Sequence, residues 1–158
     1  MNLETIELTK QNKIAVIKLN RPKLLNAVNE QLVWDLQKAT EDVKNDDAIR
    51  VVILVGSGRG FSAGADLSER KASWKGSKDA LIRGYKPFFE NIINMPKPVI
   101  GSISGPAAGI GAAIAMSCDL RVMSEDSYIL SVFSNIALVP DGGLSWYLPK
   151  YMGYSKAY

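Results

Sequence analysis

Two glycine-rich stretches of this sequence have the residues expected of a ligand-binding or catalytic site. They read Gly60-Phe-Ser-Ala-Gly-Ala-Asp-Leu67 and Gly105-Pro-Ala-Ala-Gly-Ile-Gly111. An apolar run precedes the second stretch and a run of small residues, Ala112 to Cys118, follows it, which indicates a strand, a tight turn and a buried helix. Backbone N–H groups at such a helix end are unpaired and suit a developing negative charge. Two such loops that meet could direct two N–H groups at one oxygen.

The absence of histidine limits this chemistry. None occurs among the 158 residues, so Ser-His-Asp catalysis, Cys-His catalysis and histidine metal sites are excluded. The single cysteine, Cys118, can form no internal disulfide, and its place after the small residues indicates a buried structural thiol. Proton transfer must therefore fall to Asp, Glu, Lys, Tyr or the backbone.

The composition is that of an ordinary globular protein, with 47% hydrophobic and 22% charged residues. No apolar run approaches the roughly 20 residues of a membrane span, so no membrane partner is expected. The N-terminus lacks the basic and apolar blocks of a signal peptide, which predicts a cytoplasmic protein. A net charge of +3 and the lack of a recognition motif give no reason to expect a nucleic-acid partner.

The spacing of apolar residues predicts two N-terminal strands and a helix. Alternating apolar positions over residues 3–9 and 14–19 predict strands joined by a polar turn. Asn29 is a suitable N-cap, and apolar residues recur at helical spacing from there to Asn45.

Strand-loop-helix units are then predicted over residues 51–72, 98–118 and 136–149. The continuous apolar run 51–55 is typical of a strand covered on both faces. Each unit places a loop at the carboxyl end of a strand, where α/β folds bind their ligands. The sequence therefore predicts an α/β fold with both glycine-rich loops near a ligand site.

Prolines and turn residues predict where the remaining helices and strands begin and end. A helix capped by Ser77 is expected to kink at Pro87, and Pro149 is expected to end a short helix that includes Leu144. The remaining predicted strands span residues 120–123 and 128–133. The chain stops where another helix begins, so we expect it to be a fragment of a longer protein.

Three groups of motifs occur in order along nearly the whole chain. They are Arg21-Pro-Lys23 with Asn26-Ala27 and Gly60 to Leu67; Lys97-Pro-Val-Ile-Gly101 and Gly105 to Gly111 with Cys118-Asp119; and Leu138-Val-Pro-Asp-Gly-Gly143. Together they resemble the crotonase family, also called the enoyl-CoA hydratase/isomerase family. Any one motif would be weak, but their ordered combination is specific.

The resemblance implies a spiral of repeated ββα units. Residues 1–158 would form a single crotonase-like core domain without its C-terminal part. It also implies an acyl-CoA thioester as the bound partner, with coenzyme A as part of the substrate, no separate cofactor and no metal. The full-length protein would assemble as a homotrimer or a dimer of trimers.

Carried over by position, the resemblance assigns two oxyanion-hole amides to Ala65 and Ile110. Family members often have glycine where Ile110 stands; its main-chain donor can persist, while its side chain would narrow the acyl pocket. The resemblance also assigns substrate contacts near the two loops, to Lys23, Leu25, Ala63, Asp66, Leu67, Ser68, Gly109 and Phe133. Lys23 would meet a CoA phosphate or be a solvated surface lysine, and Asp66 is expected to cap a short helix.

One acidic residue, Asp141, stands where some family members carry a catalytic acid. The two positions that hold glutamates in the hydratase pattern are occupied by Ala113 and Phe133. A single base that takes and returns a proton suffices for an isomerase, so the resemblance favours double-bond isomerisation through a thioester enolate. A partly apolar pocket of Phe133, Ile136 and Trp146 would raise the pKa of Asp141.

Other interpretations of the same residues stay open. Both glycine loops could be tight turns packed on the core, and Asp141 could merely cap the helix that follows it. A dinucleotide site at Gly109-Ile-Gly111 is disfavoured by Ile114, where close packing needs a small residue. A catalytically silent acyl-CoA-binding protein, a hydratase, a hydrolase and a dehalogenase with Asp141 as nucleophile are the functional alternatives.

Overall fold

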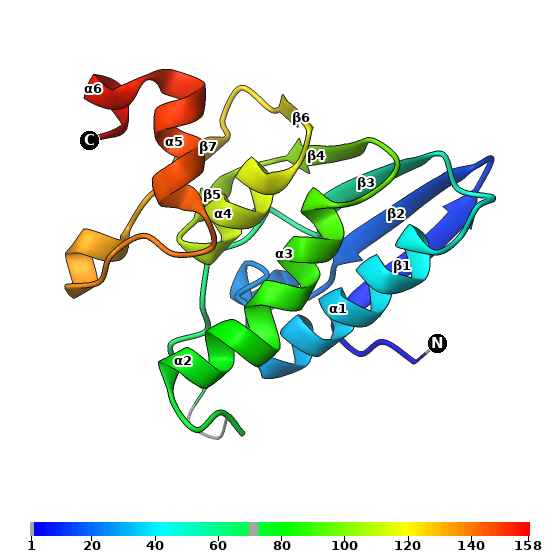
Figure 1. Ribbon diagram of the computed structural model, residues 1–158, viewed down its shortest axis with the longest axis horizontal. Helices are drawn as coiled ribbons and strands as arrows, with labels where there is room; N and C mark the ends of the chain where they lie inside the picture. Colours follow the sequence, from blue (N-terminus) through cyan, green and yellow to red (C-terminus); the bar gives the residue numbers. More distant parts are fainter. Residues whose placement is uncertain (1, 70–72) are drawn as a thin grey trace.

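The computed structural model describes residues 2–69 and 73–158, and its centre is a five-stranded sheet (Figure 1). The strand order is β1 (Ile6–Gln11), β2 (Ile14–Leu19), β3 (Val51–Gly56), β4 (Val99–Ile103) and β6 (Leu120–Met123). The first two strands form the predicted antiparallel hairpin, whose turn residues Asn12 and Lys13 have positive φ. All later pairings in this sheet are parallel, so the loops after β3 and β4 leave from the same edge.

A second, two-stranded parallel sheet pairs β5 (Pro106–Ala108) with β7 (Tyr128–Leu130). The helices are α1 (Glu30–Lys44), α2 (Ser77–Asp79), α3 (Lys86–Ile93), α4 (Ile110–Ser117), α5 (Leu144–Met152) and α6 (Tyr154–Ala157). Short 3-10 turns, η1 (Pro22–Leu24) and η3 (Phe133–Ile136), and a π-helical segment, η2 (Ala80–Tyr85), complete the described chain. No helix of residues 2–69 and 73–158 is long and apolar enough to span a membrane.

Helices α1 and α3 lie together on one face of the sheet (Figure 1). The N-cap of α1 is Asn29, as predicted, and its Oδ1 accepts a hydrogen bond from the amide of Leu32 at 3.0 Å. The buried strand residues on this face alternate with half-buried ones, in β3 as in β2. Only one face of β3 is therefore fully covered in this chain, where its continuous apolar run predicted two.

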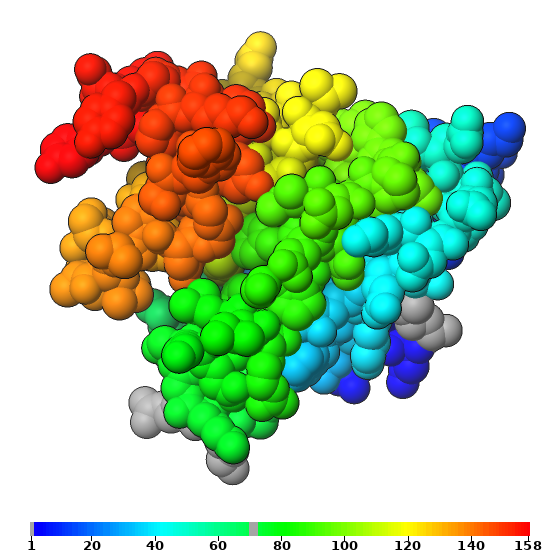
Figure 2. Space-filling view, viewed as in Figure 1, coloured from blue at the N-terminus to red at the C-terminus, as the bar shows by residue number. Residues whose placement is uncertain are grey.

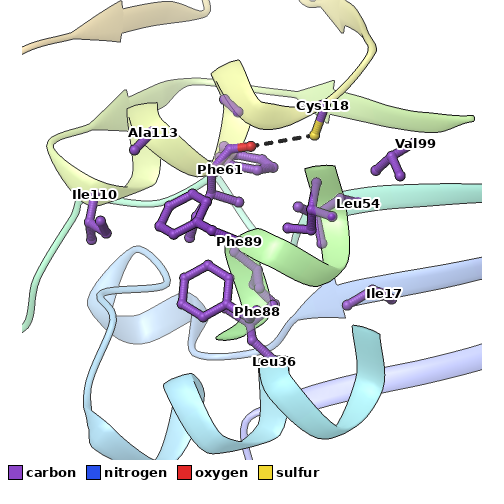
Figure 3. Close-up of a cluster of buried hydrophobic side chains, with 14 of the residues drawn as sticks. Ile17, Leu36, Leu54, Phe61, Phe88, Phe89, Val99, Ile110, Ala113 and Cys118 are labelled. Atoms are coloured by element: carbon purple, nitrogen blue, oxygen red, sulfur yellow. Dashed lines mark hydrogen bonds between the residues drawn. The ribbon is translucent and has the colours of Figure 1, made fainter. Parts of the chain in front are cut away.

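The core connects these helices to α4, which is buried along its whole length. Phe88 and Phe89 stack between α1 and α4, with ring centroids 4.4 Å apart, and Ile110 and Ala113 face the same cluster (Figure 3). Cys118 is buried as predicted, and burial raises the pKa of its thiol to about 12. The small residues of α4 thus bring the second glycine loop against the main core.

The helix predicted after Ser77 differs from the expected one. Its N-cap is Gly76, and the π-helical turn of η2 stands where the sequence predicted a kink at Pro87. Pro87 has no N–H to donate to the carbonyl of Arg83, four residues earlier. The side chain of Gln37 on α1 donates to that carbonyl at 2.8 Å, and to the carbonyl of Gly84 at 2.7 Å. A neighbouring helix therefore compensates for the proline.

Two other element ends also differ from the predicted ones. Helix α5 continues through Pro149 to Met152, and β7 ends at Leu130 rather than at Phe133. A proline removes one helix donor, and here the carbonyl that loses it belongs to the exposed residue Ser145, which water can reach. The first predicted strand-loop-helix unit ends in residues 70–72, which lie outside the described residues.

Candidate active site

The two glycine-rich loops run side by side although they are far apart in the sequence. Ser62 and Ala107 form a parallel bridge: the amide of Ser62 donates to Pro106 at 3.1 Å, and the amide of Ala108 donates to the carbonyl of Ser62 at 2.9 Å. A Cβ on Gly64 would lie only 2.8 Å from the carbonyl oxygen of Ala108. Only a glycine permits this approach, and the loops remain adjacent as they run toward Ala65 and α4.

The amide of Ala65 points away from Val28, which is hydrogen-bonded to the residues on either side of Ala65. The carbonyl of Gly64 accepts from the amide of Val28 at 2.7 Å, and the amide of Asp66 donates to the carbonyl of Val28 at 2.9 Å. In a trans peptide the N–H is opposite the C=O, so the Ala65 N–H is directed away from Val28. Within residues 2–69 and 73–158 this N–H has no acceptor.

The amide of Ile110 is free for a different reason. Ile110 is the first residue of α4, and the carbonyl before it, of Gly109, accepts from the amide of Ala113 at 3.1 Å. The Ile110 N–H therefore points out of the helix N-terminus, and no acceptor for it is found in the described parts of the chain. Gly109 has φ of 53°, which glycine adopts without strain, and its own amide donates to Leu130 at 3.0 Å.

Asp141 lies in the turn before α5, and its carboxylate is incompletely satisfied. Among the described residues, its Oδ1 is the one buried side-chain oxygen or nitrogen without a hydrogen-bond partner. Burial raises the pKa of this carboxyl above its ordinary value of 3.8. The N-cap of α5 is Gly143 and receives no side-chain bond, so the interpretation of Asp141 as a helix cap is wrong.

Gly142 holds this turn against α4 and α3. A Cβ on Gly142 would lie 2.5 Å from Cβ of Ala113, 2.8 Å from Cδ1 of Ile110 and 3.0 Å from Cζ of Phe89. Asp141 is thus adjacent in sequence to a residue that touches the side chain of the second amide donor. A larger side chain at position 113 would displace the turn.

An apolar groove of about 590 Å³ opens between η2, α3 and the start of α5. These elements lie side by side on the face shown in Figure 2. The groove is lined by Leu81, Ile82, Tyr85, Lys86, Phe89, Glu90, Ile93, Gly142, Gly143, Trp146 and Tyr147. Burial, and then the charge of Asp141, raises the pKa of Tyr85 to about 12, so its hydroxyl stays protonated beside the acid.

Three residues were predicted to form an apolar pocket around Asp141. Trp146 lines the groove, but Phe133 is buried in the core and Ile136 is 49% exposed on η3. Ile110 does not line the groove, because its side chain packs beneath Gly142. The expectation that it narrows the acyl pocket stays a prediction. The sequence missed the main walls, since the residues of α3 read simply as one face of a core helix.

The residues predicted to contact the nucleotide and pantetheine arm lie along the first loop. The amide of Ala63 donates to the carbonyl of Leu25 at 2.8 Å, while Leu67 is 79% exposed. Asp66 and Ser68 are joined by a 2.6 Å hydrogen bond, and Asp66 caps this turn rather than a helix. Their side chains are therefore occupied with each other.

Two cationic side chains, Lys23 and Arg59, lie near the start of the first glycine-rich loop. Lys23 lies in η1, and Arg59 lies in the loop whose Gly58 packs on Pro22, at 3.0 Å from a Cβ placed on Gly58. Both cations are exposed, and neither forms an ion pair within the parts of the chain that the structure describes. Arg59 was missed, although its place between Gly58 and Gly60, directly before the first glycine-rich stretch, is visible in the sequence.

The chain is thus an α/β protein with two backbone amides that lack acceptors in its described parts, and with a half-buried acid in the turn packed against the second amide's helix. The family model for enoyl-CoA hydratase/isomerase matches residues 9–158. The chain therefore belongs to the enoyl-CoA hydratase/isomerase family, and the resemblance inferred from its motifs is confirmed.

Individual relatives carry different activity names. The chain is 36% identical over 148 residues to a 1,2-epoxyphenylacetyl-CoA isomerase of Escherichia coli (91% of this chain, 56% of the relative). It is 32% identical over 157 residues to a probable enoyl-CoA hydratase of Rhodobacter capsulatus (99% and 60%). The structure of an enoyl-CoA hydratase from Mycobacterium avium subsp. paratuberculosis superposes with a TM-score of 0.87 at 30% identity, over 99% of this chain and 59% of that one. The chain thus spans about 60% of the length of these relatives, and the predicted fold class is confirmed.

Proposed function

We propose that this chain carries the active site of an acyl-CoA-processing enzyme that moves a double bond through a thioester enolate. The observation that carries the proposal is the buried, unpartnered Oδ1 of Asp141, in a turn packed against the helix whose first amide is free. A carboxylate oxygen that is buried without a hydrogen-bond donor is costly unless a ligand or a proton uses it.

The two loop amides supply the stabilisation of charge. The thioester oxygen would accept hydrogen bonds from the N–H groups of Ala65 and Ile110 as the enolate forms. Each such donor is worth roughly 3 kcal/mol of transition-state stabilisation. Since both donors belong to the main chain, the Ile110 side chain does not prevent the arrangement.

Asp141 would act as the only base. Its carboxylate takes the proton from the carbon next to the thioester carbonyl, and the electron pair of that C–H bond moves into the enolate. The proton then returns to a carbon further along the acyl chain as the double bond shifts. No atom is gained or lost, so the reaction needs no co-reactant. The raised pKa makes Asp141 a better base than an ordinary carboxylate.

Hydration is the second candidate, because relatives of similar identity carry that name. Addition of water would require a second acid-base group. The two positions where the hydratase pattern has glutamates hold Ala113 and Phe133, which are apolar and buried. The close contact of Gly142 with Ala113 leaves no room for a carboxylate at position 113. These observations favour isomerisation over hydration for this chain.

The groove supports an apolar acyl group. Leu81, Phe89, Ile93 and Trp146 line it, and the charged groups Lys86 and Glu90 on its wall lie 3.5 Å from each other. The named substrate of the Escherichia coli relative carries an aromatic ring, which such a groove would accept. We extend the proposal to apolar unsaturated acyl groups, with the CoA phosphates near Lys23 and Arg59.

The proposed assembly is a homotrimer or a dimer of trimers of the full-length protein. Large apolar side chains gather on the exposed surface of residues 120–158, among them Leu120, Val122, Val139 and Tyr154 at 58% exposure or more. Light scattering of the full-length protein tests this assembly, and a monomer would contradict it.

The experiment that tests the function is Asp141→Asn in the full-length protein. Isomerisation of a 3-enoyl-CoA and entry of solvent deuterium into the acyl chain should both fall by about 10²–10⁴. Binding of the acyl-CoA should persist, because the amides are untouched. The exposed Asp47→Asn is the matched control and should leave both rates unchanged.

Other outcomes select the alternatives. Unchanged turnover in Asp141→Asn removes Asp141 from the mechanism. Tight acyl-CoA binding without deuterium exchange in the unaltered protein would indicate a silent binding protein. A trapped acyl-enzyme detected by mass would indicate that Asp141 acts as a nucleophile instead of a base.

A further inference from the structure

We infer that Arg21 and Asp66 form a nearly buried clamp whose task is to orient the Ala65 amide, so that both are positioning residues for the first oxyanion donor. This inference rests on the proposed function. It concerns residues to which the sequence motifs gave a different role: Asp66 was expected to be a substrate contact and a helix cap, and Arg21 was only part of the first group of motifs.

The Arg21 side chain connects Ala27 to Asp66, the residue that follows Ala65. One guanidinium nitrogen donates to Oδ2 of Asp66 at 2.9 Å, and the other donates to the carbonyl of Ala27. The two side chains of the ion pair are only 17% and 9% exposed. The pair is thus well shielded from water, and its geometry is enforced more strongly than that of a surface salt bridge. The amide of Arg21 itself donates to Oδ1 of Asn26 at 2.9 Å.

The carboxylate of Asp66 is fully used inside the protein. Oδ1 accepts from the amide of Ser68 at 3.1 Å and from its hydroxyl at 2.6 Å, while Oδ2 accepts from Arg21. The Ser68 hydroxyl and then Arg21 hold the pKa of this carboxyl below its usual value. A carboxylate with these three donors has little capacity left for a ligand, and so it acts on its own backbone.

The clamp fixes the two residues that flank the donor. Gly64 is held through its carbonyl by the amide of Val28, and Asp66 is held through its amide by the carbonyl of Val28. Arg21 ties the Asp66 side chain to Ala27, the residue before Val28. Both neighbours of Ala65 are therefore held by hydrogen bonds, while its own N–H has no acceptor in the described chain. A displacement of 1 Å in such a donor can cost up to about a hundredfold in rate.

The test compares Arg21→Gln with Lys18→Gln in the full-length protein. Lys18 lies in β2 near Arg21 and pairs with the exposed Glu7, so its replacement removes the same charge without touching the loop. The probe is hexanoyl-CoA with a ¹³C-labelled thioester carbonyl, whose stretch shifts to lower frequency when two amides polarise it. The shift is recorded by infrared difference spectroscopy, together with kcat and KM on a 3-enoyl-CoA.

In Arg21→Gln we expect kcat to fall by up to about a hundredfold, and the carbonyl stretch to move back toward its value in free solution. Lys18→Gln should change neither. Asp66→Asn, which keeps the shape of the side chain, should show the same spectral change and serves if Arg21→Gln does not fold. A merely structural role would lower the folded fraction without moving the frequency of the bound carbonyl.

Two results would overturn the inference. An unchanged carbonyl frequency in both clamp variants would show that the donor does not depend on the pair. A raised KM with unchanged frequency would show that Arg21 contacts the CoA instead. If the unaltered protein itself shows no shift on binding, the oxyanion hole of the proposed function has failed rather than the clamp.

Discussion

Asp66 and Asp141 occupy two turns near the same proposed site, and the protein treats their carboxylates in opposite ways. Asp66 receives three hydrogen-bond donors, and these lower its pKa. Asp141 has a buried oxygen with no partner in the described chain, and burial raises its pKa. The Asp66 turn is thus stabilised by charged side-chain bonds, whereas the Asp141 turn is held by Gly142 packing on Ala113, Ile110 and Phe89.

The contrast between these two aspartates shows what makes a carboxylate structural and what leaves it available for catalysis. A carboxylate that accepts three hydrogen bonds inside the protein stabilises its turn and has little capacity left for a substrate. A carboxylate held in place by packing of the residue beside it remains available, at a cost in stability. Three predictions test this contrast, beyond those that accompany the two proposals.

The largest effect on stability is expected for Gly142→Ala, which attacks the turn of Asp141 through its packing. The new Cβ would meet Ala113 at 2.5 Å, at a φ of +58°. The positive φ costs about 1–2 kcal/mol, and the crowding about 1–3 kcal/mol more. Urea unfolding measures the loss.

Gly153→Ala is the matched control for this change. Gly153 also has a positive φ, +79°, but a Cβ there meets nothing within 4 Å. It should lose only the conformational part, about 1–3 kcal/mol, because its φ of 79° with ψ of 158° lies in a region that essentially only glycine adopts. Equal losses in the two variants would show that packing does not hold the Asp141 turn.

An intermediate effect is expected when each carboxylate is made neutral. Asp66→Asn should lower the free energy of unfolding by about 1.5–3 kcal/mol, because charge-assisted hydrogen bonds are lost. Asp141→Asn should leave it within about 0.5 kcal/mol of the unaltered value or raise it, since the charge on a carboxylate whose Oδ1 is buried without a partner disappears. Chemical denaturation at neutral pH measures both, and a large loss in Asp141→Asn would mean that Asp141 is structural after all.

The smallest effect is a pH dependence of opposite sign for the two acids. The folded-state pKa of Asp66 lies below the ordinary 3.8, so its contribution is present above pH 3.8 and is lost as the pH falls through the folded pKa. The folded-state pKa of Asp141 lies above 3.8, so its ionisation opposes folding, and this penalty grows as the pH rises from 3.8 through the folded pKa.

Denaturation curves of the two Asn variants against the unaltered protein isolate these dependences. The deficit of Asp66→Asn should shrink below pH 3.8, and the gain of Asp141→Asn should appear above it. If the two differences ran in the same direction with pH, the contrast between the acids would be lost.

Much of the fold could be predicted from residue patterns. The hairpin over β1 and β2, the Asn29 cap of α1 and the strand-turn-helix around Gly109 follow from local periodicity and capping. The boundaries at Pro87 and Pro149 could not, because they depend on partners supplied from elsewhere, such as Gln37, or on water at the surface.

Ordered motifs and missing residue types were enough to identify the family, the two glycine loops and the acid at position 141. The three-dimensional arrangement was needed to show that Asp66 is engaged while Oδ1 of Asp141 lacks a partner, and that α3 and α5 form walls of the groove. Hydrogen bonds such as Arg21 to Asp66 and contacts such as Gly142 to Ala113 join residues far apart in the chain. No local pattern encodes them, since they arise from the way the sheet and helices pack.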